Sequence, residues 1–470
     1  MDAVDSSPLP CGVSPGRVIR VKLGTHFATN HAHRFTYLKA PADVPAAQHD
    51  PVVAERVSAM LAEIERDGVA AVRRLSRELD GADVTELDAA ELARTGDQLP
   101  TSLREAIELG AERTQAFARL QRQHLTDFTA ELIPGLTVGH RYVPIGNVGA
   151  YLPAGRFPLT ASAFMSVGVA KVAGVPNVIA CTPPQPGGGA NAAVAYAAFV
   201  SGVDRLFVVG GVQALAAMAF GLLGVPPVDM IVGAGNAFVA EAKRQLFGTV
   251  AIDLLAGPSE VAVIADDSAD PEIVAADLLG QAEHGPTSPA ALVTTSRALG
   301  DAVIAAVDRQ LPGLSTRDIC GPAWRNHGAV ILVDDREGAV AVMDELAPEH
   351  LEVQTRHDQW YHDHLTNYGS VFLGPWSTVA YSDKGMAGTN HTLPTAGGAK
   401  HSAGLSVSRF LKPLTFQHVT ESATPNLAGA VEVISASEGM SAHEATATMR
   451  IHRFAASSPL VDSVPSPTQR

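Results

Sequence analysis

The stretch that decides the fold is residues 204–246, DRLFVVGGVQALAAMAFGLLGVPPVDMIVGAGNAFVAEAKRQL, in which two short apolar runs each precede an alanine-rich segment. Leu206–Val209 and Met230–Val232 predict buried strands, because each is short, apolar and bounded by turn residues. Val212–Leu222 and Ala237–Leu246 predict the helices that follow them. Apolar strands that alternate with helices are typical of a parallel sheet covered on both faces. The stretch therefore predicts a doubly wound α/β fold.

The same alternation continues on both sides of this stretch. Val178–Cys181 and Asn191–Val200 predict one more strand and helix before it. A second series follows Gly257, with strands predicted at Val261–Ile264, Ala291–Thr294 and Ala329–Val333 and helices at Pro271–Glu283, Arg297–Gln310 and Arg336–Leu346. Because single cores stop growing at roughly 250–300 residues, we expect two tandem parallel-sheet domains in this chain of 470 residues.

The remaining segments complete the expected domain organisation. Residues 1–35 are rich in Ser, Pro, Gly and His without a sustained period, which predicts a flexible extension, and Ser457–Arg470 has the same character. Residues 36–141 predict a helical region packing on the core, because apolar residues from Val53 to Ile64 recur at helical spacing. We expect the first sheet domain over 142–258, the second over 259–380, and a small C-terminal segment over 381–470 with a helical stretch near Thr420–Arg450.

Composition and charge disfavour several classes of function. Hydrophobic residues make up 46% and charged residues 18%, which is an ordinary globular balance. A net charge of −15 argues against nucleic acid or an anionic membrane as a partner. The three cysteines lie far apart, which argues against a disulfide framework and against a cysteine-built zinc site. No signal peptide is recognisable and no run approaches the roughly 20 apolar residues that span a bilayer, so we expect a cytoplasmic protein.

A glycine-rich turn between a predicted strand and helix is a candidate nucleotide site. Gly233-Ala234-Gly235-Asn236 would present backbone N–H groups at a helix N-terminus, where a phosphate binds favourably. The third glycine of the dinucleotide fingerprint is missing, and no clear acidic residue follows at the end of a second strand. A plain tight turn explains these residues equally well.

Two polar tetrapeptides at predicted helix ends could carry chemistry. Gln281 and His284 share a helix face, so both could ligate zinc, although a helix-end histidine is the simpler alternative. Glu349 and His350 could divide acid–base work, the carboxylate activating water and the imidazole moving a proton, although a polar turn is the simpler alternative.

Other histidines carry less information. His357, His362 and His364 look like a metal cluster, but on a helix His362 and His364 point about 200° apart, which favours a solvated face. His391 and His443 stand alone in the sequence, and isolated histidines are usually surface or core residues.

Taken together, segments from about Pro144 to Arg450 resemble the histidinol dehydrogenase family: PIGNVGAYLPAGRFPLTASAFM, GGVQALAAMAFG, GAGNAFVAEAKRQLFG, IDLLAGPSEVAVIAD, ADLLGQAEHGP, LAPEHLEV, GTNHTLPT and SEGMSAH. The resemblance implies two incomplete Rossmann-like domains, NAD bound on the first, and zinc and acid–base residues on the second. It also implies an intertwined homodimer with shared active sites, in which the C-terminal segment is exchanged. The implied reaction is the four-electron oxidation of a small polar primary alcohol through an aldehyde to a carboxylate, L-histidinol to L-histidine in the type case of the family.

The family's functional residues fall on matching residue types in this chain. The implied zinc ligands are Gln281, His284, Asp383 and His443, of which His443 would complete the site of the other subunit. The implied acid–base pair is Glu349 and His350. These six also count as implied substrate contacts, together with Ser259, His391 and Glu438, and the implied NAD contacts are Tyr151, Gln213 and Asn236.

The implied mechanism assigns one role to each acid–base residue. His350 takes the alcohol proton as the first hydride leaves to NAD. Glu349 then activates a water molecule that hydrates the enclosed aldehyde, and a second NAD accepts the second hydride. Zinc grips and orients the substrate, because Zn²⁺ has no redox chemistry of its own.

The substrate is where the sequence departs from the family pattern. Thr378–Lys384, TVAYSDK, is similar to a paralogous branch that oxidises sulfopropanediol to sulfolactate, whereas Gly257–Glu260, GPSE, keeps the histidinol-type wording. Three hypotheses follow: L-histidinol as substrate, a sulfonated or other polar diol as substrate, and a catalytically idle paralogue that only binds a metal or metabolite. The intact Glu349 and His350 count against the third.

Overall fold

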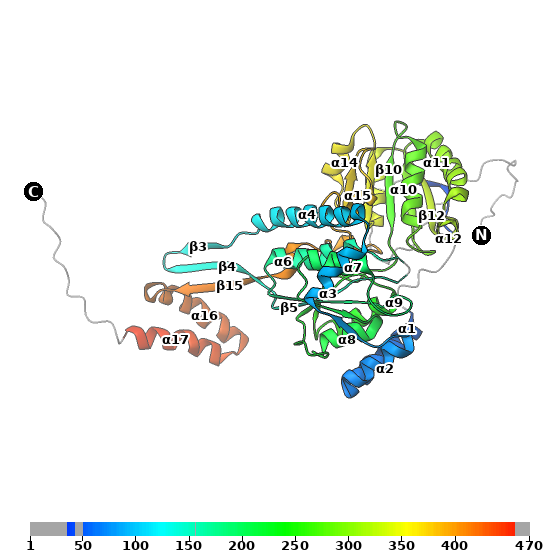
Figure 1. Ribbon diagram of the computed structural model, residues 1–470. Coiled ribbons are helices and arrows are strands. Elements are labelled where there is room, and N and C mark those ends of the chain that lie inside the picture. The colour runs from blue at the N-terminus through cyan, green and yellow to red at the C-terminus, as the bar shows by residue number, and fades with distance from the viewer. Residues whose placement is uncertain (1–34, 43–49, 156, 456–470) are drawn as a thin grey trace, which may run out of the picture.

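A computed structural model describes residues 35–42, 50–155 and 157–455. Two α/β domains form the body, and an arm that carries the last two helices projects from it (Figure 1). The predicted doubly wound fold is confirmed by the two parallel sheets. The extension predicted over residues 1–35, apart from Phe35, and the C-terminal segment Ser457–Arg470 lie outside the described residues.

The first sheet lies between two layers of helices. Its strand order is β2-β7-β6-β5-β8-β9, in which only β2 is antiparallel to its neighbour. The strands are β2 Thr85–Leu87, β5 Asn147–Tyr151, β6 Asn177–Thr182, β7 Arg205–Val208, β8 Met230–Val232 and β9 Ala251–Ile252. The central strands are buried on both faces, as their unbroken apolar runs require.

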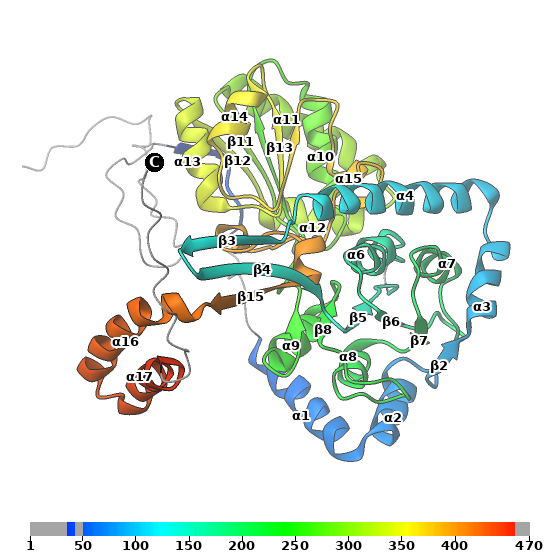
Figure 2. The same ribbon diagram turned by 90° about the vertical axis from the view of Figure 1, so that its left-hand side faces the viewer.

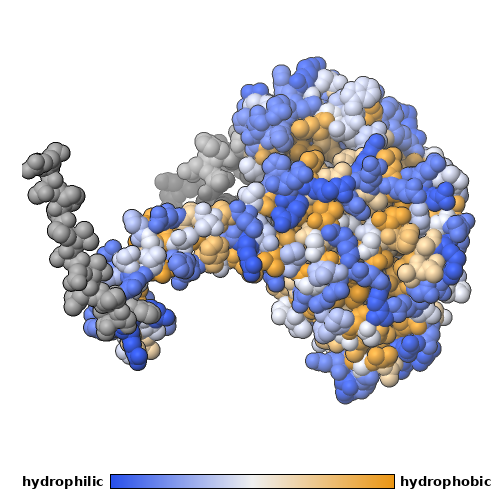
Figure 3. All heavy atoms as spheres, turned by 60° about the vertical axis from the view of Figure 1, so that its left-hand side comes forward, coloured by the Kyte–Doolittle hydropathy of each residue, from blue (hydrophilic) through white to orange (hydrophobic). Residues whose placement is uncertain are grey.

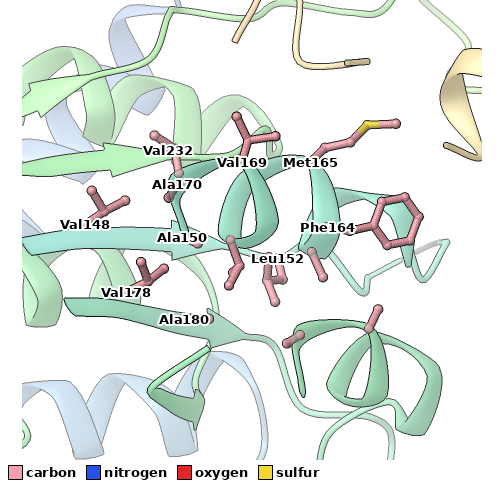
Figure 4. Close-up of a cluster of buried hydrophobic side chains, with 14 of the residues drawn as sticks. Val148, Ala150, Leu152, Phe164, Met165, Val169, Ala170, Val178, Ala180 and Val232 are labelled. Atoms are coloured by element: carbon pink, nitrogen blue, oxygen red, sulfur yellow. The ribbon is translucent and has the colours of Figure 1, made fainter. Parts of the chain in front are cut away.

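Each face of this sheet has its own hydrophobic core. One core is formed with α1 Pro51–Asp67, α2 Val69–Leu79, α8 Gly211–Ala219 and α9 Ala237–Leu246. The other is formed with α4 Thr101–Gln123, α5 Ala161–Ala163, the π-helical turn Phe164–Gly168, α6 Val169–Ala173 and α7 Ala192–Val200, next to the short α3 Ala89–Arg94. Figure 4 shows part of this second core, where Val148 and Ala150 of β5 lie near Val169 and Ala170 of α6. The helix predicted from the apolar spacing between Val53 and Ile64 is confirmed as α1, which buries Val57, Met60, Leu61 and Ile64.

The second sheet repeats the architecture. Its strand order is β1-β12-β11-β10-β13-β14, again with one antiparallel edge strand, β1. The strands are β1 Phe35–Lys39, β10 Val261–Ala265, β11 Ala290–Thr294, β12 Gly328–Val333, β13 His350–Gln354 and β14 Ser370–Leu373. Helices α10 Pro271–Ala282, α11 Arg297–Gln310 and α12 Arg317–His327 pack on one face, and α13 Arg336–Leu346 and α14 Asp358–His364 pack on the other.

Several elements of the structure were not predicted. The region 36–141, expected to be helical, also supplies the antiparallel edge strands β1 and β2 to the two sheets. Helix α12 was not predicted, and the short α15 Val379–Asp383 lies in a segment that the sequence pattern left without structure. Helix α4 crosses between the two domains (Figure 2), where Arg113 donates a hydrogen bond to the carbonyl of Met386 at 2.9 Å.

The arm is a separate, extended structure. Strands β3 Phe128–Ile133, β4 Leu136–Pro144 and β15 Leu411–Val419 form an antiparallel sheet that ends in the helices α16 Thr424–Glu438 and α17 Ser441–Ala455. Its side chains are largely exposed, including large apolar ones such as Leu132, Phe416 and Val433. Figure 3 shows hydrophobic residues along the arm and on the neighbouring face of the body. Among the described residues, no helix is long and apolar enough to span a bilayer.

Candidate active site

The amino-terminal ends of β10 and β13 bring the first group of candidate residues together. The two strands are parallel neighbours with Val261 opposite His350, so Ser259 and Glu260 lie beside Glu349. This is also the point where the strand order of the second sheet changes direction, since β11 and β12 extend to one side of β10 and β13 to the other. The sequence separates these segments widely, and the sheet makes them adjacent.

Glu349 is held by hydrogen bonds to a single carboxylate oxygen. Its Oε2 accepts from Ser259 Oγ at 2.6 Å and from the backbone N–H of Glu260 at 2.9 Å. His350 Nδ1 lies 3.4 Å from the same oxygen. Within the described residues these contacts all reach Oε2, which leaves Oε1 as the oxygen that could accept a proton from water. The side chain of Glu349 is buried, and the two hydrogen bonds to Oε2 fix its orientation.

His350 has a defined tautomer and one free nitrogen. Nδ1 lies 3.1 Å from the carbonyl oxygen of Glu260, which can only accept, so Nδ1 carries the hydrogen and Nε2 has the lone pair in the neutral ring. Nε2 is buried without a hydrogen-bond partner among the described residues, and it lies 3.7 Å from Asp383 Oδ1. Burial lowers the pKa of His350, but the carboxylates of Glu349 and Asp383 and the contact with Glu260 outweigh it and raise the pKa to about 9.

Three of the four predicted metal ligands lie at the ends of two helices that point at this edge. Gln281 is in the last turn of α10, His284 follows that helix, and Asp383 is the last residue of α15. His284 Nε2 lies 3.5 Å from Asp383 Oδ2. Gln281 Nε2 donates to Ser259 Oγ at 2.5 Å. The amide nitrogen of Gln281 is therefore occupied, and the side-chain oxygen Oε1 of Gln281 is the atom that could bind a metal.

These residues fit a divalent cation. Asp383 Oδ1 is buried and has no hydrogen-bond partner in the described part of the chain, which is costly unless another group binds it. Helix C-termini carry partial negative charge that favours a cation. Imidazole, carboxylate and amide oxygen together suit zinc without thiolate. In the described ranges no three His, Cys, Asp or Glu side chains converge on one point, because this edge supplies only His284 and Asp383 of that kind as ligands.

His391 joins this site from the direction of the first domain. The ring Nε2 of His391 lies 3.0 Å from Ser162 Oγ, and the backbone N–H of His391 donates to Met165 Sδ at 3.3 Å. The π-helical turn that contains Met165 frees the carbonyl of that residue to accept from Asn390 Nδ2 at 2.8 Å. Burial lowers the pKa of His391, so the ring is neutral, and the charge of Asp383 opposes this shift.

The predicted cofactor residues lie at the opposite, carboxyl-terminal edge of the first sheet. Tyr151 ends β5, and its hydroxyl oxygen accepts from the N–H of Gly211 at the start of α8. Gln213, in the first turn of α8, is fully buried; its Nε2 donates to Asp80 at 2.9 Å and its Oε1 has no partner among the described residues. Burial and the Asp80 carboxylate raise the pKa of Tyr151 to about 12, so the hydroxyl keeps its proton.

Asn236 caps the helix that follows the glycine-rich turn. Its side-chain oxygen accepts from the N–H groups of Phe238 at 3.0 Å and Val239 at 3.1 Å. Gly233 has a φ of +112°, and a Cβ there would lie 2.2 Å from the carbonyl oxygen of Tyr151, so only glycine fits. The buried pair of Lys243 and Asp253 holds the same turn through the carbonyl and the N–H of Gly233.

Two predicted site residues lie away from both edges. Glu438 ends α16 and His443 is in the first turn of α17, so both are on the arm and exposed, away from the body of their own chain (Figure 1). His357, His362 and His364 do not form a metal cluster: His364 stacks on Trp360 and His362 is exposed on α14.

Sequence reasoning missed three residues that contact the candidate site. Glu260 accepts from the N–H groups of Glu349 at 3.3 Å and Ala396 at 3.0 Å, while Glu349 accepts from the N–H of Glu260. Ser162 contacts His391, and Asp80 contacts Gln213. Only Glu260 had a local signal, since it follows Ser259 directly in the sequence.

Comparison with known proteins gives a consistent result. The family model for histidinol dehydrogenase matches residues 45–451. A histidinol dehydrogenase homolog of Shouchella clausii is 48% identical over 86% of this chain and 95% of its own length. A sulfopropanediol 3-dehydrogenase of Ruegeria pomeroyi is 42% identical over 86% of this chain and 93% of its own length. A crystal structure of histidinol dehydrogenase from Elizabethkingia anophelis is 33% identical, with a TM-score of 0.82 over 88% of this chain and 95% of that one.

Proposed function

The chain belongs to the histidinol dehydrogenase family of NAD-dependent oxidoreductases that act on CH–OH groups, and from this premise we propose that it oxidises a small polar primary alcohol through an aldehyde to a carboxylate. The proposed substrate is L-histidinol, the proposed hydride acceptor is NAD and the proposed metal is zinc. A cytoplasmic location is part of the same proposal.

The observation that carries the proposal is the pairing of Glu349 with His350 beside Asp383. The pair presents one base nitrogen, His350 Nε2, and one carboxylate oxygen, Glu349 Oε1, with Asp383 and His284 next to them. An alcohol-to-acid oxidation needs two proton acceptors, one for the hydroxyl and one for the water that adds to the aldehyde. A catalytically idle paralogue would have no use for both.

The first oxidation uses the fixed tautomer of His350. With Nδ1–H bonded to the carbonyl of Glu260, Nε2 of the neutral ring, the form that predominates above its pKa of about 9, accepts the hydroxyl proton as the C–H bond gives up its hydride. Ser162 holds the neutral ring of His391 at the edge of the same site, where it can hydrogen bond to the substrate without adding a charge.

The second oxidation uses Glu349. The carboxylate takes a proton from water, and the hydroxide adds to the aldehyde carbon to form a hydrate whose C–H bond yields the second hydride. Ser259 and the N–H of Glu260 hold Oε2 during this step, so that Oε1 keeps its orientation toward the water. Such a base contributes a rate factor on the order of 10²–10⁴.

The bound groups that this chemistry needs have residues that fit them. Gln281, His284 and Asp383 would hold zinc together with His443 of the partner subunit, and zinc would supply a point of attachment that orients the alcohol oxygen. Tyr151, Gln213 and Asn236 would hold NAD, and two NAD molecules bound in succession would each accept one hydride.

The test is the number of NADH molecules released per alcohol by the purified, zinc-loaded enzyme. We expect two NADH per L-histidinol and loss of activity with a chelator, restored by Zn²⁺. One NADH with accumulation of an aldehyde would contradict the four-electron proposal. No turnover of any polar alcohol by a protein that binds both zinc and NAD would favour the idle paralogue.

A second candidate substrate is sulfopropanediol. The relative named for that substrate is 42% identical to this chain, compared with 39–40% for relatives named histidinol dehydrogenase, and Thr378–Lys384 resembles that branch. Glu349, His350 and the proposed metal ligands serve either alcohol, because they act on the reacting CH–OH group. Turnover of sulfopropanediol but not of L-histidinol, measured in parallel, would decide for this candidate.

We also propose that active sites are shared between two subunits. The arm places His443 outside the body of its own chain, and its exposed apolar residues are suited to burial against a second copy. Mixing unfolded His443→Ala and Glu349→Gln chains and refolding them tests this. Each mixed dimer would contain one intact site, so roughly a quarter of wild-type activity should return. If the refolded mixture stays as inactive as the two parents, the sites are not shared.

A further inference from the structure

A pair of carboxyl groups lies behind the candidate site and takes no part in the proposed reaction. Asp277 projects from α10 and Glu352 from β13, and the two side chains are hydrogen bonded to each other. Glu352 is completely buried and Asp277 is partly buried. Among the described residues neither carboxyl forms an ion pair with a lysine or arginine, so no cation compensates for their burial.

One proton shared between the two groups accounts for this arrangement. Burial raises the pKa of both carboxyls, and the charge of Asp277 raises the pKa of Glu352 further. Two adjacent buried carboxyls cannot both ionise at low cost. Glu352 is the more deeply buried of the two, and Asp277 accepts from Thr378 and Gln354, so the proton belongs on Glu352, which then donates to an ionised Asp277.

The remaining hydrogen bonds of the pair come from two elements. Gln354 Nε2, on the same strand as Glu352, donates to Asp277 Oδ2 at 2.8 Å and to Glu352 Oε2 at 3.2 Å. Thr378 Oγ donates to Asp277 Oδ1 at 3.1 Å, and the N–H of Val379 donates to Glu352 Oε1 at 3.0 Å. Three of these four hydrogen bonds come from side chains. The fourth comes from the backbone N–H of Val379, the residue that begins α15.

Each of the three connected elements carries a residue of the candidate site. Asp277 lies one helical turn before Gln281 on α10, and Glu352 lies on the same face of β13 as His350, two residues along. Val379 is the first residue of α15 and Asp383 is the last. The carboxyl pair therefore fixes the base of α15 against the two elements that present Gln281 and His350. Because α15 has only five residues, a shift at Val379 would be transmitted to Asp383.

We propose that Asp277 and Glu352 are positioning residues that share a proton and hold Asp383 in place to bind the metal next to His284 and His350. The inference rests on the proposed function, since it gives a supporting role to residues around the proposed metal site. Groups that orient metal ligands typically change metal affinity by roughly 10–100-fold when removed.

The experiment measures the dissociation constant for Co²⁺, a coloured substitute for Zn²⁺, by absorbance titration of chelator-treated full-length enzyme. Asp277→Asn should weaken Co²⁺ binding by at least roughly 10-fold. An asparagine has only one acceptor oxygen, whereas Asp277 accepts from Thr378, Gln354 and Glu352. Glu352→Gln should weaken Co²⁺ binding less than Glu352→Ala does, because the glutamine amide can still donate to Asp277 and accept from Val379.

Two further variants keep the result interpretable. Thr378→Val removes one hydrogen bond to Asp277 with little change of shape, so it tests the proposal if Asp277→Asn does not fold. Asp204→Asn is a control for the loss of a carboxylate elsewhere, since Asp204 accepts from the backbone N–H of Val178 at 2.7 Å and forms an ion pair with Lys171 in the first domain. We expect a weaker Co²⁺ site in Thr378→Val and an unchanged one in Asp204→Asn.

The outcomes separate this inference from the proposed function. If Asp277→Asn and Thr378→Val lower the melting temperature but bind Co²⁺ as tightly as the wild type, the pair is only structural and the inference is wrong. An equal loss of affinity in Glu352→Gln and Glu352→Ala would also contradict it, because the shared proton would then have no role. If the wild-type protein binds neither Co²⁺ nor Zn²⁺, the proposed metal site itself fails.

Discussion

The two sheets of the body share one architecture but present opposite edges to their candidate sites. In the first domain Tyr151, Gln213 and Asn236 lie at the carboxyl ends of the strands, where helices α8 and α9 begin. In the second domain Glu349, His350 and Ser259 lie at the amino ends of the strands, where α10 and α15 end. Ligands of doubly wound sheets usually bind at the carboxyl edge, so the second domain departs from the rule.

The difference follows the charge that each edge offers. Helix N-termini carry partial positive charge and free N–H groups, which suit the phosphates of a dinucleotide. Helix C-termini carry partial negative charge, which suits a cation held by Gln281, His284 and Asp383. In the proposed function, one chain would therefore place an anionic cofactor and a metal-bound alcohol on two similar domains by using one edge of each.

The largest effect should come from Glu349→Gln, which removes the base at the amino edge of the second sheet. We expect oxidation of the aldehyde to slow by on the order of 10²–10⁴-fold, because the amide cannot accept a proton from water. Zinc content should stay the same, since Glu349 is not a proposed ligand. Stopped-flow measurement with the alcohol and with the aldehyde supplied separately checks this. Unchanged aldehyde oxidation would remove Glu349 from the mechanism.

His284→Ala should have the next largest effect, on the metal. Loss of a direct ligand should weaken zinc binding by more than the roughly 10–100-fold typical of groups that only orient ligands. NAD binding should be unaffected, because the cofactor residues are at the other domain's carboxyl edge. Equilibrium dialysis with zinc and fluorescence titration with NADH measure the two separately. A parallel loss of NADH affinity would mean that the two edges are not independent.

Asn236→Ala, at the first sheet, should weaken NAD binding and leave zinc binding unchanged. It removes the cap of α9, which costs about 1 kcal/mol of stability and disturbs the N–H groups that would face a phosphate. We expect KM for NAD to rise roughly 3- to 10-fold, with zinc affinity unchanged. Steady-state kinetics over a range of NAD concentrations gives the value. An increase in KM for the alcohol alone would contradict the assignment.

Glu260→Gln should have the smallest effect, visible as a change in pH dependence. Burial and the nearby Glu349 charge raise the pKa of Glu260 to about 7 in the folded protein. A raised carboxyl pKa means that its contribution to stability is full below the ordinary value of about 4.5 and is lost as the pH rises through 7. The melting temperature of Glu260→Gln relative to wild type should therefore increase between pH 5 and 8. A difference that does not vary with pH would show that Glu260 stays ionised when folded.

The sequence predicted the parallel strands β6, β7, β8, β10, β11 and β12, because their apolar runs are local signals, but it did not predict the buried strands β5 and β13. Met230–Val232 forms a strand with the predicted bounds, and Ala237–Leu246 a helix with the predicted bounds. The edge strands β1 and β2 were missed, since each is short and pairs with a strand far away in the sequence. The arm was also missed: β3 is exposed along its length and most of β4 is only half-buried, so neither has the buried apolar run by which the other strands were recognised.

The candidate site depended on resemblance more than on pattern. Gln281, His284 and Glu349 gave only weak signals by themselves, and nothing in the sequence connects them with Asp383 before the sheet brings them together. The supporting residues Asp80, Ser162 and Glu352 could not be identified in advance, because a contact partner has no local signature. Their roles appear only through the hydrogen bonds they make.

The arm has a consequence for how the enzyme would be controlled in a cell. If His443 completes a neighbouring site, a folded but solitary chain has no working catalytic centre, and its output depends on how often chains meet. Specific activity would then fall on dilution, and a defective copy would impair the normal chain with which it pairs. Gene dosage, and not only substrate supply, would set the flux through this reaction.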